Sequence, residues 1–323
     1  MLTRRSFFKQ TGLGVAATVT PALLAGAAAN FAFTGNANAA GNGAATGGAG
    51  SGSGALVPAQ IVGAKGVADS FRLGAAGYTF VHFKLEKTLE MLRRVDVHYL
   101  CIKDFHLPLN SAPEQIEAFH ARCAAAGVTG YAVGPIYVDS EKKLRANFEY
   151  AKRVGVKLLV GVPCEIGPNK KRRASAKLVK LAGKLVADYD IRYAIHNHGP
   201  DMPELFPNAE SGIELIGDAD PRLGLCLDIG HELRDGRDPV AAVLKYAPRI
   251  HDIHIKNVTA ASKAGRGIEL PRGKIDFPAF VRALRKVGYT GVCSLEYEKD
   301  MKDPLLGIAE SIGYFRGVMD ATR

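Results

Sequence analysis

Three short segments in the second half of the chain place histidines and carboxylates at the ends of apolar runs. They are Ala194–Gly199 (AIHNHG), Cys226–His231 (CLDIGH) and Ile250–Asn257 (IHDIHIKN), and together they hold five of the nine histidines. A fourth segment, Ser294–Glu298 (SLEYE), adds two glutamates. Imidazole nitrogens and carboxylate oxygens in one site suit Mn²⁺, Zn²⁺, Fe²⁺ or Co²⁺. If the fold brings the four segments together, the pattern predicts a divalent metal centre.

Alternation along these segments selects the side chains that can meet. In a β-strand only every second residue faces the same side. The sets that share a side are His196 with His198, Asp252 with His254 and Lys256, and Glu296 with Glu298. A single histidine is more often an ordinary hydrogen-bonded or surface residue, but that explanation fits four successive segments poorly.

Eight apolar runs are the elements that would have to position these side chains. The predicted strands are 71–77, 97–103, 128–134, 156–162, 191–197, 223–228, 250–256 and 291–296. Segments with helical periodicity lie between them, at 84–94, 113–126, 140–154, 174–189, 239–246 and 278–287. Several of these begin at a capping residue or a proline, and several end at a glycine.

Strands and helices that alternate over about 260 residues predict an α/β fold, a (β/α)8 TIM barrel that forms a single catalytic domain. A doubly wound open sheet is the alternative. It would favour a glycine-rich phosphate turn after the first strand, and residues 74–77 (GAAG) are only a weak version of one. A barrel builds its active site at the carboxyl ends of its strands, which is where the candidate residues lie.

The first 39 residues predict a twin-arginine signal peptide. RRSFFK at 4–9 is followed by an apolar stretch at 12–29 and by an A-x-A cleavage site at 37–39. An uncleaved membrane anchor or a buried helix is the alternative, and Pro21 and the small-residue bias disfavour a stable spanning helix. We therefore expect a protein exported in folded form to the periplasm or another extracytoplasmic site, with no stable membrane insertion after cleavage. Residues 40–57 are then a flexible Gly-rich linker, and residues 58–323 the TIM-barrel catalytic domain.

Composition excludes several other classes of protein. The five cysteines form no CxxC pair, which argues against a zinc ribbon, an iron–sulfur site or a disulfide scaffold. The net charge of +10 includes three bases in a leader that has no acid. The basic run at 170–173 (KKRR) is typical of a solvated loop, so no nucleic-acid partner is expected.

At the candidate metal-binding segments the chain resembles the xylose isomerase-like TIM-barrel family, also called sugar phosphate isomerases/epimerases. The resemblance covers roughly residues 70–320. Its most specific parts are 226–231 (CLDIGH), 252–256 (DIHIK), 272–277 (RGKIDF) and 288–291 (GYTG) leading to Glu296. It implies one divalent ion, of Mn, Zn, Co, Fe or Mg, held by residues from strands five to eight.

Carried over position by position, the resemblance makes Asp228, His254 and Glu296 metal ligands and places His231 against the substrate. The family commonly has glutamate at the first ligand position, where this chain has His196, which can also bind a metal. Glu296, His198, Lys256 and Glu298 are the candidate catalytic residues, because a base must lie within reach of the proton that it removes. Further candidate substrate-binding residues are Lys103, His106, Asn197 and Arg272.

These residues predict a metal-dependent sugar isomerase or epimerase that works through an enediolate on an unphosphorylated sugar or sugar derivative. A metal-dependent lyase (eliminase or dehydratase) or glycoside-cleaving enzyme acting on a keto-sugar is the first alternative, because the proton-shuttling glutamate of the epimerases is replaced by His196. A non-catalytic carbohydrate-binding barrel is the second alternative, and a nuclease like the apurinic endonucleases comes last. The expected partner is a small carbohydrate, with a homo-oligomer or an exported oxidoreductase partner left open.

Overall fold

The computed structural model describes residues 69–167 and 170–323. The predicted signal peptide, the predicted linker and residues 58–68 of the predicted barrel domain lie outside the described residues.

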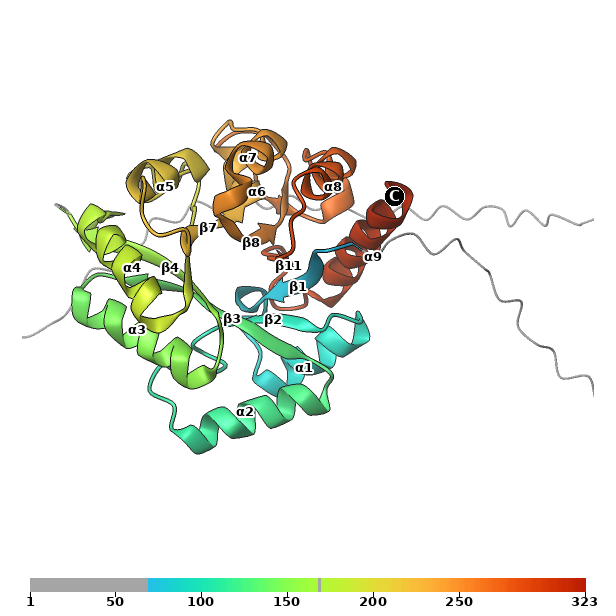
Figure 1. Cartoon of the computed structure of the whole chain (residues 1–323). Helices are drawn as coiled ribbons and strands as arrows, with labels where there is room; N and C mark the ends of the chain where they lie inside the picture. Colours follow the sequence, from blue (N-terminus) through green and yellow to red (C-terminus); the bar gives the residue numbers. More distant parts are fainter. Residues whose placement is uncertain (1–68, 168–169) are drawn as a thin grey trace, which may run out of the picture. The chain divides into compact units, whose positions relative to one another are not determined.

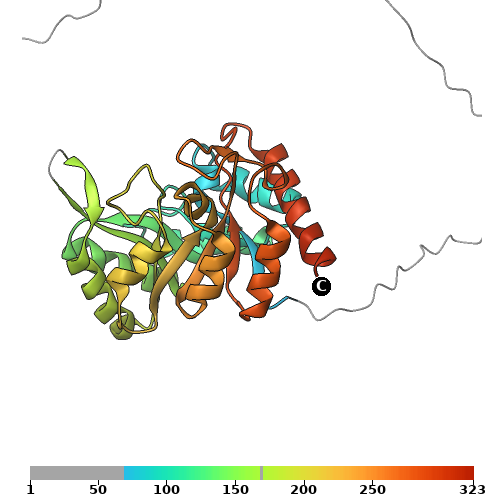
Figure 2. The same cartoon turned by 90° about the horizontal axis from the view of Figure 1, so that it is seen from above.

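Eight parallel strands form a closed barrel, and the helices surround it (Figures 1 and 2). The barrel strands are β1 (Arg72–Ala76), β2 (Tyr99–Ile102), β3 (Thr129–Val138), β4 (Leu158–Ile166), β6 (Arg192–His196), β7 (Leu223–Asp228), β8 (Ile250–Ile255) and β11 (Val292–Leu295). Their order is β3-β2-β1-β11-β8-β7-β6-β4, and pairing of β3 with β4 closes the ring. The TIM-barrel prediction is confirmed, and each barrel strand overlaps one of the eight predicted runs.

Nine α-helices lie in the described part of the chain. They are α1 (Leu85–Arg94), α2 (Pro113–Ala125), α3 (Glu141–Val154), α4 (Ala176–Tyr189), α5 (Ala209–Ile216), α6 (Ile229–Arg234), α7 (Pro239–Tyr246), α8 (Phe277–Lys286) and α9 (Leu305–Ala321). Of these, α5, α6 and α9 were not among the helices predicted above. Three short strands complete the structure: β5 (Arg172–Ala174) pairs antiparallel with β4, and β9 (Asn257–Val258) pairs with β10 (Gly267–Ile268).

Local signals explain where the helices begin and end. Asp276 Oδ1 accepts a hydrogen bond from the first turn of α8, at Ala279 N (2.8 Å), and Asp238 Oδ1 does the same at Val240 N (2.8 Å) for α7. These contacts satisfy amide groups that have no partner within the helix. Helix α3 ends at Gly155, whose φ of 79° lies in the left-handed region that glycine adopts without strain.

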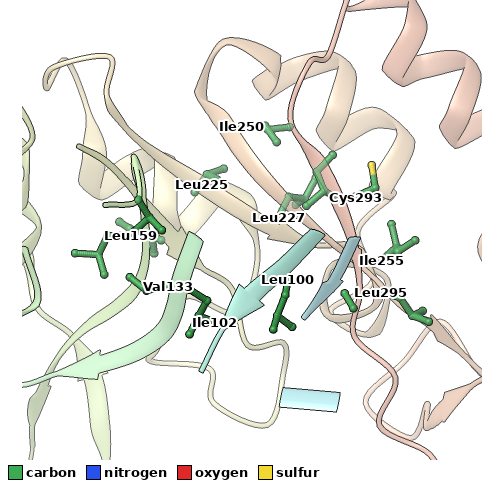
Figure 3. Packing of buried hydrophobic residues seen from close by; sticks show 14 of the residues in the cluster. Leu100, Ile102, Val133, Leu159, Leu225, Leu227, Ile250, Ile255, Cys293 and Leu295 are labelled. Atoms are coloured by element: carbon green, nitrogen blue, oxygen red, sulfur yellow. The ribbon is translucent and has the colours of Figure 1, made fainter. Parts of the chain in front are cut away.

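Alternate strand residues divide the core into two parts. Large apolar side chains of the strands form a continuous buried cluster with the helices, and Figure 3 shows ten of them with labels. Smaller side chains at alternate positions, such as Cys101, Ala132, Ala194 and Cys226, form a second buried cluster. Leu225 and Leu227 thus belong to the first cluster, and Cys226 between them belongs to the second.

Among the described residues, no helix is both long and apolar enough to cross a membrane.

Candidate metal centre

Four neighbouring strands deliver one potential metal ligand each at the carboxyl end of the barrel. His196 and Asp228 are the last residues of β6 and β7, His254 is the penultimate residue of β8, and Glu296 directly follows β11. The strand register sets Asp228 beside His254. All four side chains are buried, with at most 4% of any residue exposed. The fold therefore brings together the four ligands expected from the sequence.

The distances within this cluster suit a single shared ion. His196 Nε2 lies 3.1 Å from His254 Nδ1, and Glu296 Oε2 lies 3.3 Å from that same Nδ1. Asp228 Oδ2 lies 3.7 Å from His196 Nε2, and one ligand atom from each residue lies within 4.8 Å of the others. Two nitrogens bound to one tetrahedral ion at about 2.1 Å would lie about 3.4 Å apart. The donor set can therefore hold a divalent metal.

The pKa values of the four ligands shift in different directions, and that of His254 is raised well above its usual value because Cys226 and Glu296 outweigh the opposing effect of burial. Burial lowers the pKa of His196 to about 4, so its imidazole is neutral at neutral pH and has a free lone pair. Burial raises the pKa of Asp228 to about 7. Burial also opposes ionisation of Glu296, but the positive charge of Lys256 outweighs this and holds the pKa of Glu296 well below its usual range. Asp228 Oδ2 is buried, and its nearest cationic partner is Lys256 Nζ, at 3.1 Å.

Lys256 neutralises the carboxylates next to the cluster. Its Nζ lies 3.1 Å from Asp228 Oδ2, 3.0 Å from Glu296 Oε2 and 3.0 Å from Glu298 Oε2. Burial opposes the charge on this lysine, but the three carboxylates outweigh that effect and raise its pKa well above the usual value. The lysine stem passes directly over Gly230, where a Cβ atom would lie 2.2 Å from Lys256 Cγ. Lys256 is therefore held as an ammonium ion against the cluster.

A pocket of about 200 Å³ opens beside the four ligands. It is lined by Tyr78, Lys103, Pro135, Tyr137, His196, His198, His231, Glu296 and Glu298. His198 and Tyr137 form a pair, with His198 Nε2 2.6 Å from Tyr137 Oη. Burial raises the pKa of Tyr137 to about 12 and lowers that of His198 to about 3, so both side chains are neutral.

Three of the candidate substrate-binding residues lie at this end of the barrel. Lys103 lines the pocket and donates to the Pro135 carbonyl oxygen (2.6 Å), and His231 lines it above Asp228. Asn197 has a different role. Its Nδ2 donates a hydrogen bond to the Asp228 carbonyl oxygen (3.1 Å), and its Oδ1 accepts one from the Asp228 backbone N–H (2.7 Å). Asn197 therefore ties the ends of β6 and β7 together and is not part of the pocket lining.

The structure does not bring His106 or Arg272 to this pocket. His106 Nε2 lies 3.2 Å from Thr88 Oγ1 and 3.1 Å from the Phe83 carbonyl oxygen. Arg272 makes a two-pronged ion pair with Glu310, at 2.7 and 2.6 Å. Each of them lines another cavity, so in this structure neither contacts the metal ligands.

Sequence reasoning missed Tyr78 and Tyr137, the two tyrosines of the pocket. The predicted third strand stopped at residue 134, before Pro135, whereas β3 continues to Val138. The strand absorbs the proline where its register with β4 shifts, between Val133 and Ile136. Because of this shift, alternation continued from Val133 would have placed Tyr137 on the helix-facing side, so the pattern alone could not have found it.

Comparison with known proteins agrees with this fold. A family model described as "Xylose isomerase-like TIM barrel" matches residues 74–318. A rhizopine catabolism protein, MocC, of Rhizobium meliloti is 30% identical over 139 residues, which cover 38% of this chain and 42% of the relative. An inosose dehydratase of Clostridium botulinum is 23% identical over 217 residues, 57% of this chain and 72% of the relative.

The match to MocC thus spans less than half of that relative's length. Among solved structures, a xylose isomerase-like TIM barrel protein from Mycobacterium smegmatis in complex with magnesium aligns with a TM-score of 0.62 at 18% identity. The alignment covers 79% of this chain and all of that one. With the family match running through nearly the whole barrel, the chain belongs to the xylose isomerase-like TIM barrel family.

Proposed function

We propose that the protein is a divalent-metal-dependent lyase that removes the proton next to a carbonyl group of a sugar or polyol derivative and then expels a leaving group from the adjacent carbon. The observation that carries this proposal is the buried set His196, Asp228, His254 and Glu296, of which His196 and Glu296 line the pocket. A divalent ion held by these four residues would act as a Lewis acid on the substrate's carbonyl oxygen.

Proton transfer falls to two separate pairs of side chains at the pocket. Glu298 follows β11 and pairs with Lys256, which follows β8, whereas Tyr137 lies on β3 and pairs with His198, which follows β6. In the strand order, β11, which leads to Glu298, and β3, which carries Tyr137, stand three positions apart around the ring of eight. A base on one side and an acid on the other are what an elimination requires.

The chemical step then balances within the pocket. Glu298 takes the proton from the carbon next to the carbonyl, and the electron pair forms an enediolate whose negative charge faces the ammonium ion of Lys256. When the enediolate collapses, the bond to the leaving oxygen on the next carbon breaks. Tyr137, which is protonated at neutral pH and in the free enzyme donates to His198 Nε2, gives its proton to that oxygen, and water returns a proton to the phenolate.

Isomerisation and epimerisation begin with the same proton removal as the elimination. They differ from it because the proton then returns to a carbon atom and no leaving group is expelled. Epimerisation needs a second base close to the metal, which the ligand glutamate supplies in the epimerases that the chain resembles. At that position this chain has His196, whose pKa of about 4 makes it a poor base. The likeness to an inosose dehydratase also supports elimination.

The pocket supports a carbohydrate as the substrate. Its volume of about 200 Å³ suits a single sugar ring, and Tyr78 and Tyr137, each 39% exposed, offer aromatic faces at its edge. Both lysines at the pocket are already engaged, Lys103 by the Pro135 carbonyl and Lys256 by carboxylates, which favours an unphosphorylated substrate. We further propose that the enzyme works outside the cytoplasm, where the predicted twin-arginine signal would deliver it.

The test is product analysis in deuterated water. The full-length chain, loaded with Mn²⁺, is given a keto-glycoside and, separately, the corresponding free ketose, and NMR follows the products. We expect release of the aglycone together with an unsaturated keto-sugar, and loss of this activity in Glu298→Gln and Tyr137→Phe. His98→Ala is the matched control, because His98 is exposed and pairs with Asp96 on the surface.

Two results would overturn the proposal. Interconversion of ketoses without release of the aglycone would make the protein an isomerase. Binding of the sugar without turnover or deuterium incorporation would make it a carbohydrate-binding barrel.

A further inference from the structure

We propose that the amino end of the barrel, opposite to the metal centre, binds a small anion that carries at least two negative charges, either a diphosphate or a polycarboxylate. A cavity of about 590 Å³ opens there, compared with about 200 Å³ for the pocket at the metal centre. Among the residues that line it are the first residues of four barrel strands, namely Arg72 of β1, Leu158 of β4, Arg192 of β6 and Val292 of β11. The cavity is therefore separate from the metal centre, which lies where the strands end.

Two arginines line this cavity from opposite sides of the barrel. Arg72 begins β1 and Arg192 begins β6, and these strands stand four positions apart in either direction around the ring of eight. Arg192 alternates on β6 with Ala194 of the inner cluster and with His196 of the metal centre, so its side chain leaves the strand on the inner side. Two positive charges thus face one cavity across the barrel axis.

Neither arginine forms an ion pair with a carboxylate in the described part of the chain. Arg72 lies instead over an aromatic ring, with its Cζ 5.4 Å from the centroid of Tyr99. Both arginines are exposed, so water and dissolved ions reach them. Their charges are therefore available to a ligand.

The acids at this cavity are already matched by other bases. Asp190, the one acid among the described residues that line it, accepts a hydrogen bond from Lys157 Nζ (2.8 Å). Arg222 also lines the cavity and donates two hydrogen bonds to Asp220 (3.0 and 2.7 Å). These two acids balance these two bases, which leaves the charges of the two arginines uncompensated.

The rest of the chain cannot supply the missing negative charge from outside the described range. Residues 1–68 and 168–169 contain no aspartate and no glutamate. A cavity walled by charges of one sign concentrates ions of the opposite sign. We therefore expect the counter-charge to come from a bound anion.

The chemistry of the lining indicates which anions fit. Guanidinium groups bind phosphate and carboxylate oxygens through paired hydrogen bonds. Two of them on opposite walls suit an anion with negative charge at both ends. His251 adds a polar group without a charge, because burial lowers its pKa to about 4 and the charge of Arg192 acts in the same direction. Its Nε2 is buried without a hydrogen-bond partner in the described structure.

The test is isothermal titration calorimetry of the full-length chain, stripped of metal, with pyrophosphate and separately with citrate at constant ionic strength. We expect at least one of the two anions to bind, and its Kd to rise about 10-fold or more in Arg72→Gln and in Arg192→Gln, because each variant removes charge-assisted hydrogen bonds. Arg145→Gln is the matched control, since Arg145 is exposed on α3 and its loss changes the net charge equally. Both cavity arginines are exposed, so their variants should fold as the wild type does.

The same titrations on the chain loaded with Mn²⁺ separate this site from the metal centre. Binding in the metal-free wild type that is weakened in both arginine variants but not in Arg145→Gln would support the proposal, whether or not the protein proves to be a lyase. Anion binding that requires Mn²⁺, or that stays unchanged in either arginine variant, would place the anion elsewhere and overturn it. A wild type that binds neither pyrophosphate nor citrate would overturn it as well.

Discussion

Replacing Lys256 by methionine should destabilise the metal-free protein strongly. Its ammonium lies 3.0–3.1 Å from three carboxylate oxygens and is 5% exposed. At an effective dielectric constant of 20, each such contact corresponds to about 5–6 kcal/mol of Coulomb attraction. Most of this is offset by the cost of burying the charges. Removing one partner of a buried ion pair typically costs about 3–5 kcal/mol, which is the loss we expect in the free energy of unfolding.

Two conditions should reduce this loss. Mn²⁺ at 100 times its Kd stabilises a protein by about 2.7 kcal/mol. At one fixed Mn²⁺ concentration the gain should be larger in Lys256→Met than in the wild type, because the ion then binds Asp228 and Glu296 more tightly, without repulsion from the lysine. Lower pH should also help, since the unneutralised carboxylates can take up protons, so the loss at pH 8.5 should exceed that at pH 6.

The assay is urea unfolding with EDTA and with Mn²⁺, at both pH values. Lys245→Met is the matched control, because Lys245 forms an exposed ion pair with Glu210 (3.2 Å) and should change stability little. The reasoning is refuted if Lys256→Met loses no more stability than Lys245→Met in EDTA, or if Mn²⁺ stabilises it no more than it stabilises the wild type.

Two further predictions concern stability away from the pocket. Burial opposes ionisation of Glu269, but hydrogen bonds from Lys299 and Tyr297 hold its pKa at about 2, below the 4.5 of a free glutamate. The stability that this carboxylate contributes is therefore present above pH 4.5 and lost as the pH falls toward 2. Over that pH range, the free energy of unfolding measured with urea should fall by about 1–3 kcal/mol more in the wild type than in Glu269→Gln. If the free energy of unfolding depends on pH in the same way in both proteins, this prediction is wrong. Phe315 is fully buried on α9, so Phe315→Ala should lower the free energy of unfolding by about 3–5 kcal/mol. Leu306 on the same helix is 80% exposed, so Leu306→Ala should change it little. Equal losses of the two variants in thermal unfolding would contradict the packing described.

The barrel could be predicted from the sequence because its signals are local. Each strand is an apolar run between turn residues, and the number of alternating elements indicates a barrel. The four metal ligands follow from strand ends and alternation, since parallel neighbours place their last residues side by side. Glu296 and His254 meet for this reason, although 42 residues separate them in the sequence.

Loop geometry is where the sequence says least. Arg272 lies on the connection after β8, and no periodicity indicates that it turns toward Glu310 on α9. His106 likewise turns back toward Thr88 on α1. Tyr137 was missed for a different reason, because proline normally ends a central strand and here it does not. Tertiary packing, which one sequence does not reveal, decides all three cases.

The most direct test of the metal centre is the metal content of the purified full-length chain. Elemental mass spectrometry would compare the wild type with His196→Ala and Glu296→Ala, and with His98→Ala as a surface control, after loading with Mn²⁺ or Zn²⁺ and removal of free metal. We expect about one ion per chain in the wild type and in His98→Ala, and loss of the ion in the two ligand variants. A wild type that retains no metal after loading, or ligand variants that retain as much as the wild type, would contradict it.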